Sequence, residues 1–131
     1  MSDYTDQTPI ATAEQFKRAL LAVRDRDGIS QQELGMLRAH CRAPDHTITA
    51  TRLAQEAGLT SYGVANLQYG RFAHALADRL SYDPTKREDG TTRWWFTLAI
   101  GRDGSDETEE GHFEWIMRPE LVQALQEMRW A

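Results

Sequence analysis

A short segment, residues 47–67, places the strongest constraint on how this chain can fold. Ala54 is small enough for a close helix contact, Gly58 permits the left-handed backbone of a sharp turn, and Leu59 follows as an apolar plug. Val64 and Leu67 then recur at helical spacing and offer apolar contacts from a second helix. Together these offsets predict a helix-turn-helix whose turn lies at Gly58.

Two further helices are expected before this motif. Thr12 and Ser30 are suitable N-cap residues, and Gln15 and Glu33 stand three positions after them, as in a capping box. Apolar residues recur at helical spacing after each cap. The expected core positions are Phe16, Ala19, Leu20, Val23, Leu34, Met36, Leu37 and Cys41.

The second helix of the motif is predicted to run long, over residues 61–80. Its expected apolar line is Val64, Leu67, Phe72, Leu76 and Leu80. Two interior glycines, at positions 63 and 70, each cost a helix about 1 kcal/mol relative to alanine. We therefore expect a bend near position 70 or the close approach of another backbone. The pairs Tyr62-Gly63 and Tyr69-Gly70, seven residues apart on nearly one face, are interpreted as a packing device more than a binding one.

An antiparallel β-hairpin is expected after the helices. Residues 93–100 and 112–117 are rich in aromatic and β-branched side chains, and an acidic, glycine-bounded loop separates them. Pro119 then opens a final helix. The predicted fold class is α+β: a helical bundle with a helix-turn-helix, an antiparallel hairpin and a C-terminal helix, which is the plan of a winged helix. Residues 1–11 are expected to form a flexible tail, and residues 12–131 a single domain.

Composition restricts the class of protein. A chain of 131 residues with 40% hydrophobic residues can bury one core without the help of disulfides or a structural metal. Its single cysteine, Cys41, cannot form an internal disulfide. The N-terminus has neither the basic start nor the apolar run of a signal peptide, and no stretch is apolar enough to span a membrane. These features predict a cytoplasmic protein that does not contact a membrane.

The charge is unevenly distributed. The net charge is -5, which argues against non-specific binding to nucleic acid. Residues 13–87, however, carry eleven Lys/Arg against eight Asp/Glu, whereas residues 88–131 carry four against ten. The helix-turn-helix region is therefore mildly basic. Its arginines can face a phosphate backbone or can simply form solvated helix faces; they are Arg38, Arg42, Arg52, Arg71 and Arg79.

For a DNA-reading motif, the first turns of the second helix should enter the major groove. Asn and Gln can bond adenine in a bidentate manner, and Ser or Thr can hold phosphates. The alternative is that these polar side chains face water. The expected DNA-binding residues are Arg38, Arg52, Thr60, Ser61, Tyr62, Asn66, Gln68 and Arg71.

Catalytic and metal-binding signals are weak. The four histidines and Cys41 have no spacing typical of a zinc site, and Cys41 on an apolar helical line is expected in the core. The chain has no phosphate-cradling glycine loop, serine elbow or nuclease-like histidine cluster. We therefore expect no enzyme activity, no catalytic residue, no bound metal and no cofactor.

The acidic loop, residues 103–110, lacks the ligand pattern of an EF-hand. We expect it to be solvated and mobile, with phosphate mimicry towards a basic partner as a second interpretation. As the tip of a wing it would repel phosphate, because such tips usually carry Lys or Arg. This is the chief argument within the sequence against a standard winged-helix contact with DNA.

Beyond these patterns, the chain resembles small uncharacterised bacterial proteins and is similar to a module that precedes HNH endonuclease domains in some longer proteins. The residues that carry this resemblance are Ile48–Ala50, Leu53-Ala54, Ala65–Gly70, Trp115–Leu121 and Ala124-Leu125. The resemblance implies a DNA-reading or target-positioning part that acts beside a separate nuclease. No His-Asn-His cassette follows in this chain, so nuclease activity is not implied.

Two functions of different classes follow. The first is a DNA-binding module in bacterial defence or regulation. The alternative is a protein–protein interaction module that uses the acidic loop or the aromatic segment with Trp94 and Trp95. The sequence does not indicate the oligomeric state of the protein.

Overall fold

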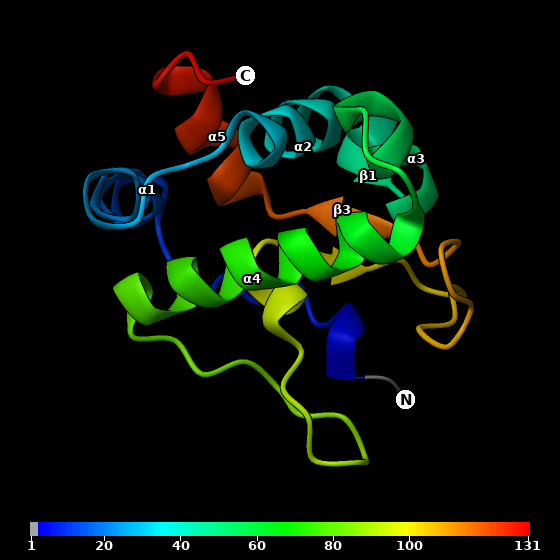
Figure 1. Ribbon diagram of the computed structural model, residues 1–131. Helices are drawn as coiled ribbons and strands as arrows, with labels where there is room; N and C mark the ends of the chain where they lie inside the picture. The colour runs from blue at the N-terminus through cyan, green and yellow to red at the C-terminus, as the bar shows by residue number, and fades with distance from the viewer. Residues whose placement is uncertain (1–2) are drawn as a thin grey trace.

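The first two helices begin where the sequence places their caps. The computed structural model describes residues 3–131 (Figure 1). Helix α1 (Ala13–Arg26) follows Thr12 and helix α2 (Gln31–Arg42) follows Ser30, and both capping boxes are formed. Each box satisfies backbone N–H groups that a helix start otherwise leaves unpaired. All the core positions expected on these two helices are buried except Leu34, which is half-buried.

Helices α3 (Ala50–Ala57) and α4 (Tyr62–Leu80) meet at the tight turn predicted around Gly58. Gly58 has φ +71°, in the left-handed region, and caps α3. The Leu59 N–H donates to the Ala54 carbonyl at 2.8 Å, which closes the turn. Ser61 then caps α4 through the N–H of Val64. Glycine at position 58 adopts this backbone without the steric cost that a side chain would add.

The antiparallel pairing of the predicted hairpin is confirmed. Strand β2 (Ala99–Gly101) pairs with β3 (Trp115–Met117), and Ile100 lies opposite Ile116. A third strand, β1 (Thr47–Ile48), follows the short 3-10 helix η2 (Pro44–His46) and pairs with the other edge of β3. Helix α5 (Pro119–Glu127) begins at the predicted proline. Within residues 3–131 the fold is thus α+β, with five α-helices and a three-stranded sheet.

The prediction of a strand from residue 93 is wrong at its start. Trp94–Thr97 form a 3-10 helix, η3, and the strand begins only at Ala99. Trp95, Phe96 and Thr97 are consecutive and all buried. A strand directs successive side chains to opposite faces, whereas a helical turn placed between α4 and the sheet can bury three in a row.

Helix α4 crosses in front of the sheet in Figure 1 and packs on η3, α1 and α3. Its buried face consists of Ala65, Tyr69, Phe72, Ala73, Leu76 and Ala77. The prediction that Leu67 packs inward is wrong, because this side chain is 56% exposed. Tyr69, two positions later, is buried in its place. Val64 and Leu80 are half-buried.

The close approach of another backbone predicted at the two glycines of α4 is absent among the described residues. The helix runs without interruption from Tyr62 to Leu80. A Cβ built on Gly70 would meet no described atom within 4 Å, and one built on Gly63 would approach only Ser61 Oγ at 3.7 Å. No close neighbour therefore accounts for either glycine. Of the two Tyr-Gly pairs interpreted as a packing device, Tyr69 is buried in the core and Tyr62 is exposed.

Three residues of the N-terminal segment, which was expected to form a flexible tail, contact the domain; residues 1 and 2 lie outside the described residues. The 3-10 helix η1 (Asp3–Thr5) places the Tyr4 ring edge-on to Phe113, with centroids 5.2 Å apart. The Tyr4 hydroxyl donates to the Ser105 carbonyl. Arg118 donates to the Thr8 carbonyl, and Ala11 is buried in the core.

Candidate nucleic-acid interface

The eight residues expected to bind DNA lie mainly at the surface. Gln68 is half-buried. The other seven are exposed, namely Arg38, Arg52, Thr60, Ser61, Tyr62, Asn66 and Arg71. The structure distributes them over more than one region of the surface.

Arg38 and Arg52 line one groove of about 690 Å³ together with Arg42, between α2, β1 and the start of α3. Arg38 Nε donates to the Trp130 carbonyl at 2.7 Å, which fixes this side chain across the C-terminal end of the chain. Arg52 Nε pairs with Glu56 at 3.0 Å. An exposed pair of this kind leaves the arginine available to another anion, because such pairs contribute little stability.

The first turn of α4 lies against the acidic loop. The Tyr62 hydroxyl donates to Glu110 Oε2 at 2.8 Å, and this carboxylate raises the pKa of Tyr62. Thr51, at the start of α3, donates to the Gly111 carbonyl through both its hydroxyl and its N–H. The loop between β2 and β3 is therefore attached to both helices of the α3–α4 corner.

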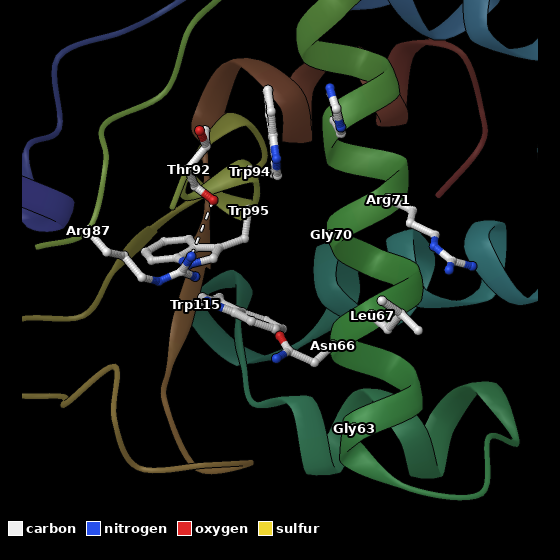
Figure 2. Close-up of a pocket in the computed structure, with 11 residues that line it drawn as sticks. Gly63, Asn66, Leu67, Gly70, Arg71, Arg87, Thr92, Trp94, Trp95 and Trp115 are labelled. Atoms are coloured by element: carbon white, nitrogen blue, oxygen red, sulfur yellow. Dashed lines mark hydrogen bonds between the residues drawn. The ribbon is translucent and has the colours of Figure 1, made fainter. Parts of the chain in front are cut away.

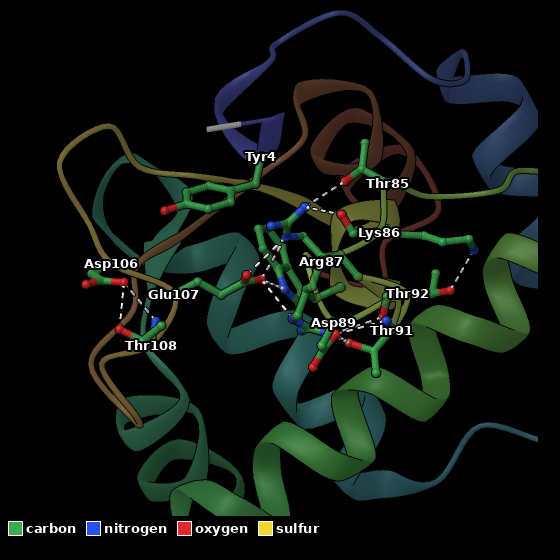
Figure 3. Close-up of polar contacts among 12 residues, drawn as sticks. Tyr4, Thr85, Lys86, Arg87, Asp89, Thr91, Thr92, Asp106, Glu107 and Thr108 are labelled. Carbon is green, nitrogen blue, oxygen red and sulfur yellow. Dashed lines mark hydrogen bonds and ion pairs between the residues drawn. The ribbon is translucent and has the colours of Figure 1, made fainter. Parts of the chain in front are cut away.

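Glu107 turns inward from the acidic loop and forms the centre of a polar cluster (Figure 3). Its carboxylate pairs with Arg93 Nε at 3.0 Å and Arg87 Nε at 3.4 Å, and it accepts the Trp95 indole N–H at 3.0 Å. The Glu107 side chain is only 17% exposed. The expectation of a solvated loop is wrong at this residue, since Glu107 ties the loop to the segment 85–95.

A slot opens along α4 beside this cluster (Figure 2). It has a volume of about 370 Å³. Arg87 and Trp95 lie on one side and α4 on the other, while Asn66 points from α4 towards Trp115. The lining residues are Gly63, Asn66, Leu67, Gly70, Arg71, His74, Arg87, Thr92, Trp94, Trp95 and Trp115.

The glycines of α4 account for the width of this slot. Gly63, Asn66 and Gly70 lie at helical spacing on the lining face, and two of the three have no side chain. Each interior glycine costs about 1 kcal/mol relative to alanine. Because no described packing contact requires them, the open space itself is the structural consequence of having glycine there.

Trp115 lines the slot, and a hydrogen bond from His40 to its carbonyl holds its backbone in place. His40 Nε2 donates to the Trp115 carbonyl at 3.0 Å, and the Tyr69 hydroxyl donates to His40 Nδ1 at 2.8 Å. A carbonyl can only accept, so His40 must carry its proton on Nε2. The Trp115 indole N–H is buried and has no acceptor among the residues that the structure describes. Burying such a donor unpaired costs free energy.

Sequence reasoning did not identify Arg87, Thr92, Gly70 or Trp115 as neighbours of Asn66. Glycines seven positions apart with Asn66 between them were the available signal, because this spacing puts all three on one helix face. The adjoining hollow, of about 380 Å³, extends from Asn66 and Tyr62 to the acidic residues Glu109 and Glu110.

Other kinds of site find less support in residues 3–131. No three His, Cys, Asp or Glu side chains in this part of the chain gather in a way that could hold a metal ion. Cys41 is buried, and burial raises the pKa of its thiol. None of the described helices has the length and apolarity needed to cross a membrane.

Comparison with known proteins gives no match to a protein-family model, to a curated protein or to a solved structure.

Proposed function

We propose that this chain is a DNA-binding module in which α3 and α4 form a helix-turn-helix and α4 reads the duplex. On this proposal the antiparallel β2–β3 hairpin, which follows α4 in the chain, is the wing, and the loop 102–114 is its tip. On this proposal Asn66 and Gln68 contact base edges, while Thr60 and Ser61 hold phosphates. Tyr62 lies between them at the start of α4.

One observation supports the proposal most directly: the start of α4 is exposed beyond a tight turn, while the rest of the helix is anchored in the core. Ser61 and Asn66 are exposed, whereas Tyr69 and Phe72 farther along the helix are buried. A recognition helix needs this arrangement, because its first turns must project while the remainder fixes its orientation.

Phosphate contacts are assigned to two groups of arginines. Arg38, Arg42 and Arg52 line the groove between α2 and α3. Arg71 lies five residues beyond Asn66 on α4 and has no ion-pair partner among residues 3–131. Arginines in these positions position the duplex without reading its sequence.

The acidic loop gives the interface selectivity. Glu109 and Glu110 are exposed beside the start of α4, and their charges oppose any phosphate that approaches from that side. A duplex is therefore held only where the arginine contacts outweigh this repulsion. The net charge of -5 acts in the same direction, because it weakens non-specific binding.

The proposed context is bacterial defence or regulation beside a separate nuclease, as the resemblance to modules that precede HNH domains implies. In this context the chain supplies target recognition, and the cleavage chemistry comes from another polypeptide.

The test is binding to a pool of random-sequence duplexes at low salt, followed by fluorescence anisotropy. Asn66→Ala should weaken binding to the selected sequences about tenfold. Arg52→Ala should weaken binding to all sequences and lower the slope of log affinity against log salt by about one. Arg18→Ala, at an exposed position of α1, is the matched control and should change neither. Duplex binding that is absent at low salt, or indifferent to both variants, overturns the proposal.

A second candidate is a protein-interaction module whose contact is the acidic loop. It is favoured by the way Glu107 fixes the loop while Glu109 and Glu110 remain exposed. The double charge reversal Glu109→Lys with Glu110→Lys distinguishes the two candidates, because it should have opposite effects on DNA binding and on binding to a protein partner. It should strengthen DNA binding by removing repulsion, and it should abolish binding to a basic protein partner.

A further inference from the structure

We propose that the slot beside α4 binds one nucleotide unit, a planar base together with its phosphate, supplied either by a DNA strand with an unstacked base or by a free nucleotide. If the base comes from a DNA strand, this inference rests on the proposed DNA-binding function; if the ligand is a free nucleotide, it does not.

The walls of the slot select a flat ligand. Trp95 lies on one side, and the indole of Trp94 stacks on the His74 ring at 3.6 Å with an interplanar angle of 9°. Trp115 lies near Asn66 at the other end of the slot in Figure 2. Bases that leave a duplex or come from single strands are held by stacking on such side chains. A volume of about 370 Å³ falls at the small end of the usual range for ligand pockets.

The polar groups of the slot suit the edge of a base. The Asn66 side chain carries both a donor and an acceptor, and it points towards Trp115. The Trp115 residue is 4% exposed, and its N–H has no acceptor among residues 3–131. A base nitrogen or carbonyl oxygen supplies the kind of acceptor that this donor lacks, once the ligand displaces the side chains that cover the N–H in the free protein. A purely apolar ligand would leave both groups unsatisfied.

The charge of the slot favours an anion. Its cationic lining residues are Arg71, whose side chain points away from Trp95 in Figure 2, and Arg87, whose Nε pairs with Glu107 at 3.4 Å; none of the described lining residues is acidic. The absence of an acid among these lining residues contrasts with the chain as a whole, whose net charge is -5. Arg87 is held in place by bonds to Thr91 and Thr92, so its guanidinium is positioned before a ligand arrives.

The two glycines of α4 leave the space in which a ligand of this shape would lie. A Cβ at Gly70 would enter space that no described atom occupies. Side chains at positions 63 and 70 would fill the side of the slot formed by α4, and the helix would gain stability from them. The chain thus keeps a cavity where alanine would make the helix more stable.

The experiment follows the indole N–H signals of the full chain by NMR while three probes are added separately: deoxyadenosine monophosphate, a short single strand and a mixed-sequence duplex. The signal of Trp115 should shift on binding. Gly70→Leu, which fills the slot, should weaken this binding at least about tenfold. Gly70→Ala provides a smaller change at the same position. Gln126→Leu, at an exposed position of α5, is the control for adding a leucine and should leave binding unchanged.

The outcomes separate the two sources and the two proposals. A shift with the single strand or duplex alone supports a base from DNA. A shift with the mononucleotide alone supports the free nucleotide, and this result stands even if duplex binding fails. Duplex binding that survives in Gly70→Leu with unchanged indole signals overturns the slot proposal and leaves the proposed function intact. N-acetyltryptophanamide, an aromatic compound without phosphate, is added as a fourth, control probe, and shifts of the Trp115 signal caused by it alone overturn the proposal as well.

Discussion

The indole N–H of Trp95 donates to Glu107 Oε2 at 3.0 Å, and this bond joins the base of the slot to the acidic loop. The same carboxylate pairs with Arg93 and Arg87, which belong with Trp95 to the segment 85–95 on the side of the slot that faces α4. Glu107 thus positions the loop that lies beside α4 and the segment that carries Arg87. One carboxylate sets the geometry of both the candidate DNA face and the slot.

We predict that Glu107→Gln lowers the free energy of unfolding by about 2 kcal/mol, because two arginines near the interior lose their counter-charge. The amide keeps the size of the side chain and can still accept the Trp95 N–H, so the loss reports the charge. The measurement is urea unfolding at neutral pH. Limited proteolysis should also cut the loop 102–114 faster in this variant.

Glu109→Gln is the matched control. Glu109 is exposed and belongs to the same loop, so this change should alter the free energy of unfolding by less than about 0.5 kcal/mol. Equal effects of the two substitutions would contradict the anchoring role of Glu107.

The helix starts and the α3–α4 turn could be predicted from sequence because short-range chemistry determines them. Thr12 and Ser30 satisfy N–H groups three residues away, and Gly58 satisfies a backbone conformation at its own position. Such interactions depend on nearby residues, which a sequence displays directly.

The errors arose where tertiary packing determines the outcome. Residues 94–97 have the composition of a strand but form a 3-10 helix, because α4 packs on them from one side. β1 has only two residues, and it exists because β3 offers an unpaired edge. Leu67 is apolar yet exposed, and periodicity alone could not distinguish it from Tyr69.

For the candidate site, the sequence predicted which side chains are exposed but not which of them lie next to one another in space. Asn66 was expected at a DNA face, whereas its approach to Trp115 joins residues 49 positions apart in the chain. Glu107 was expected in a solvated loop because nothing near it in sequence indicates the Arg93 pairing. Contacts of this separation follow from topology, which local patterns do not contain.

Two glycine substitutions should have opposite effects on stability. Gly70→Ala should raise the free energy of unfolding by about 1 kcal/mol, because the new Cβ meets no described atom and the helix loses a flexible residue. Gly58→Ala should lower it by about 1 kcal/mol, because φ is +71° there. Thermal and urea unfolding measure both. A destabilised Gly70→Ala variant would show that the slot is smaller than described.

His40 should make stability depend on pH. Burial lowers its pKa from 6.5 to about 4, so the unfolded chain binds a proton that the folded chain refuses. This contribution to stability is complete above pH 6.5 and is lost as pH falls from 6.5 towards 4. A shift of this size corresponds to about 3 kcal/mol at the acid end. Urea unfolding across this pH range gives the dependence.

His40→Phe supplies the comparison for this pH dependence. The variant should be less stable at neutral pH, because the Tyr69 hydroxyl and the Trp115 carbonyl lose their partner. Its stability should also fall less between pH 6.5 and 4 than that of the parent chain. A pH dependence as steep as the parent's would assign the effect to other groups.

Arg118 is the largest fully buried side chain, and we predict that lysine is a poorer replacement for it than methionine. The guanidinium lies 4.5 Å above the Phe96 ring and donates to the carbonyls of Phe96 and Thr8. Lysine keeps the charge, but its compact ammonium is strongly hydrated and cannot reproduce the planar contact. Methionine loses the hydrogen bonds and also removes the cost of burying a charge, which is why the pKa of Arg118 is lowered.

We therefore expect Arg118→Lys to lower the free energy of unfolding by about 3 kcal/mol and Arg118→Met by about half as much. Urea unfolding compares the two variants. Both should also loosen the segment around Thr8, because each loses the guanidinium bond to the Thr8 carbonyl, and faster proteolysis of this segment measures the loosening. A lysine variant as stable as the methionine variant would mean that charge, and not planar geometry, is what this site requires.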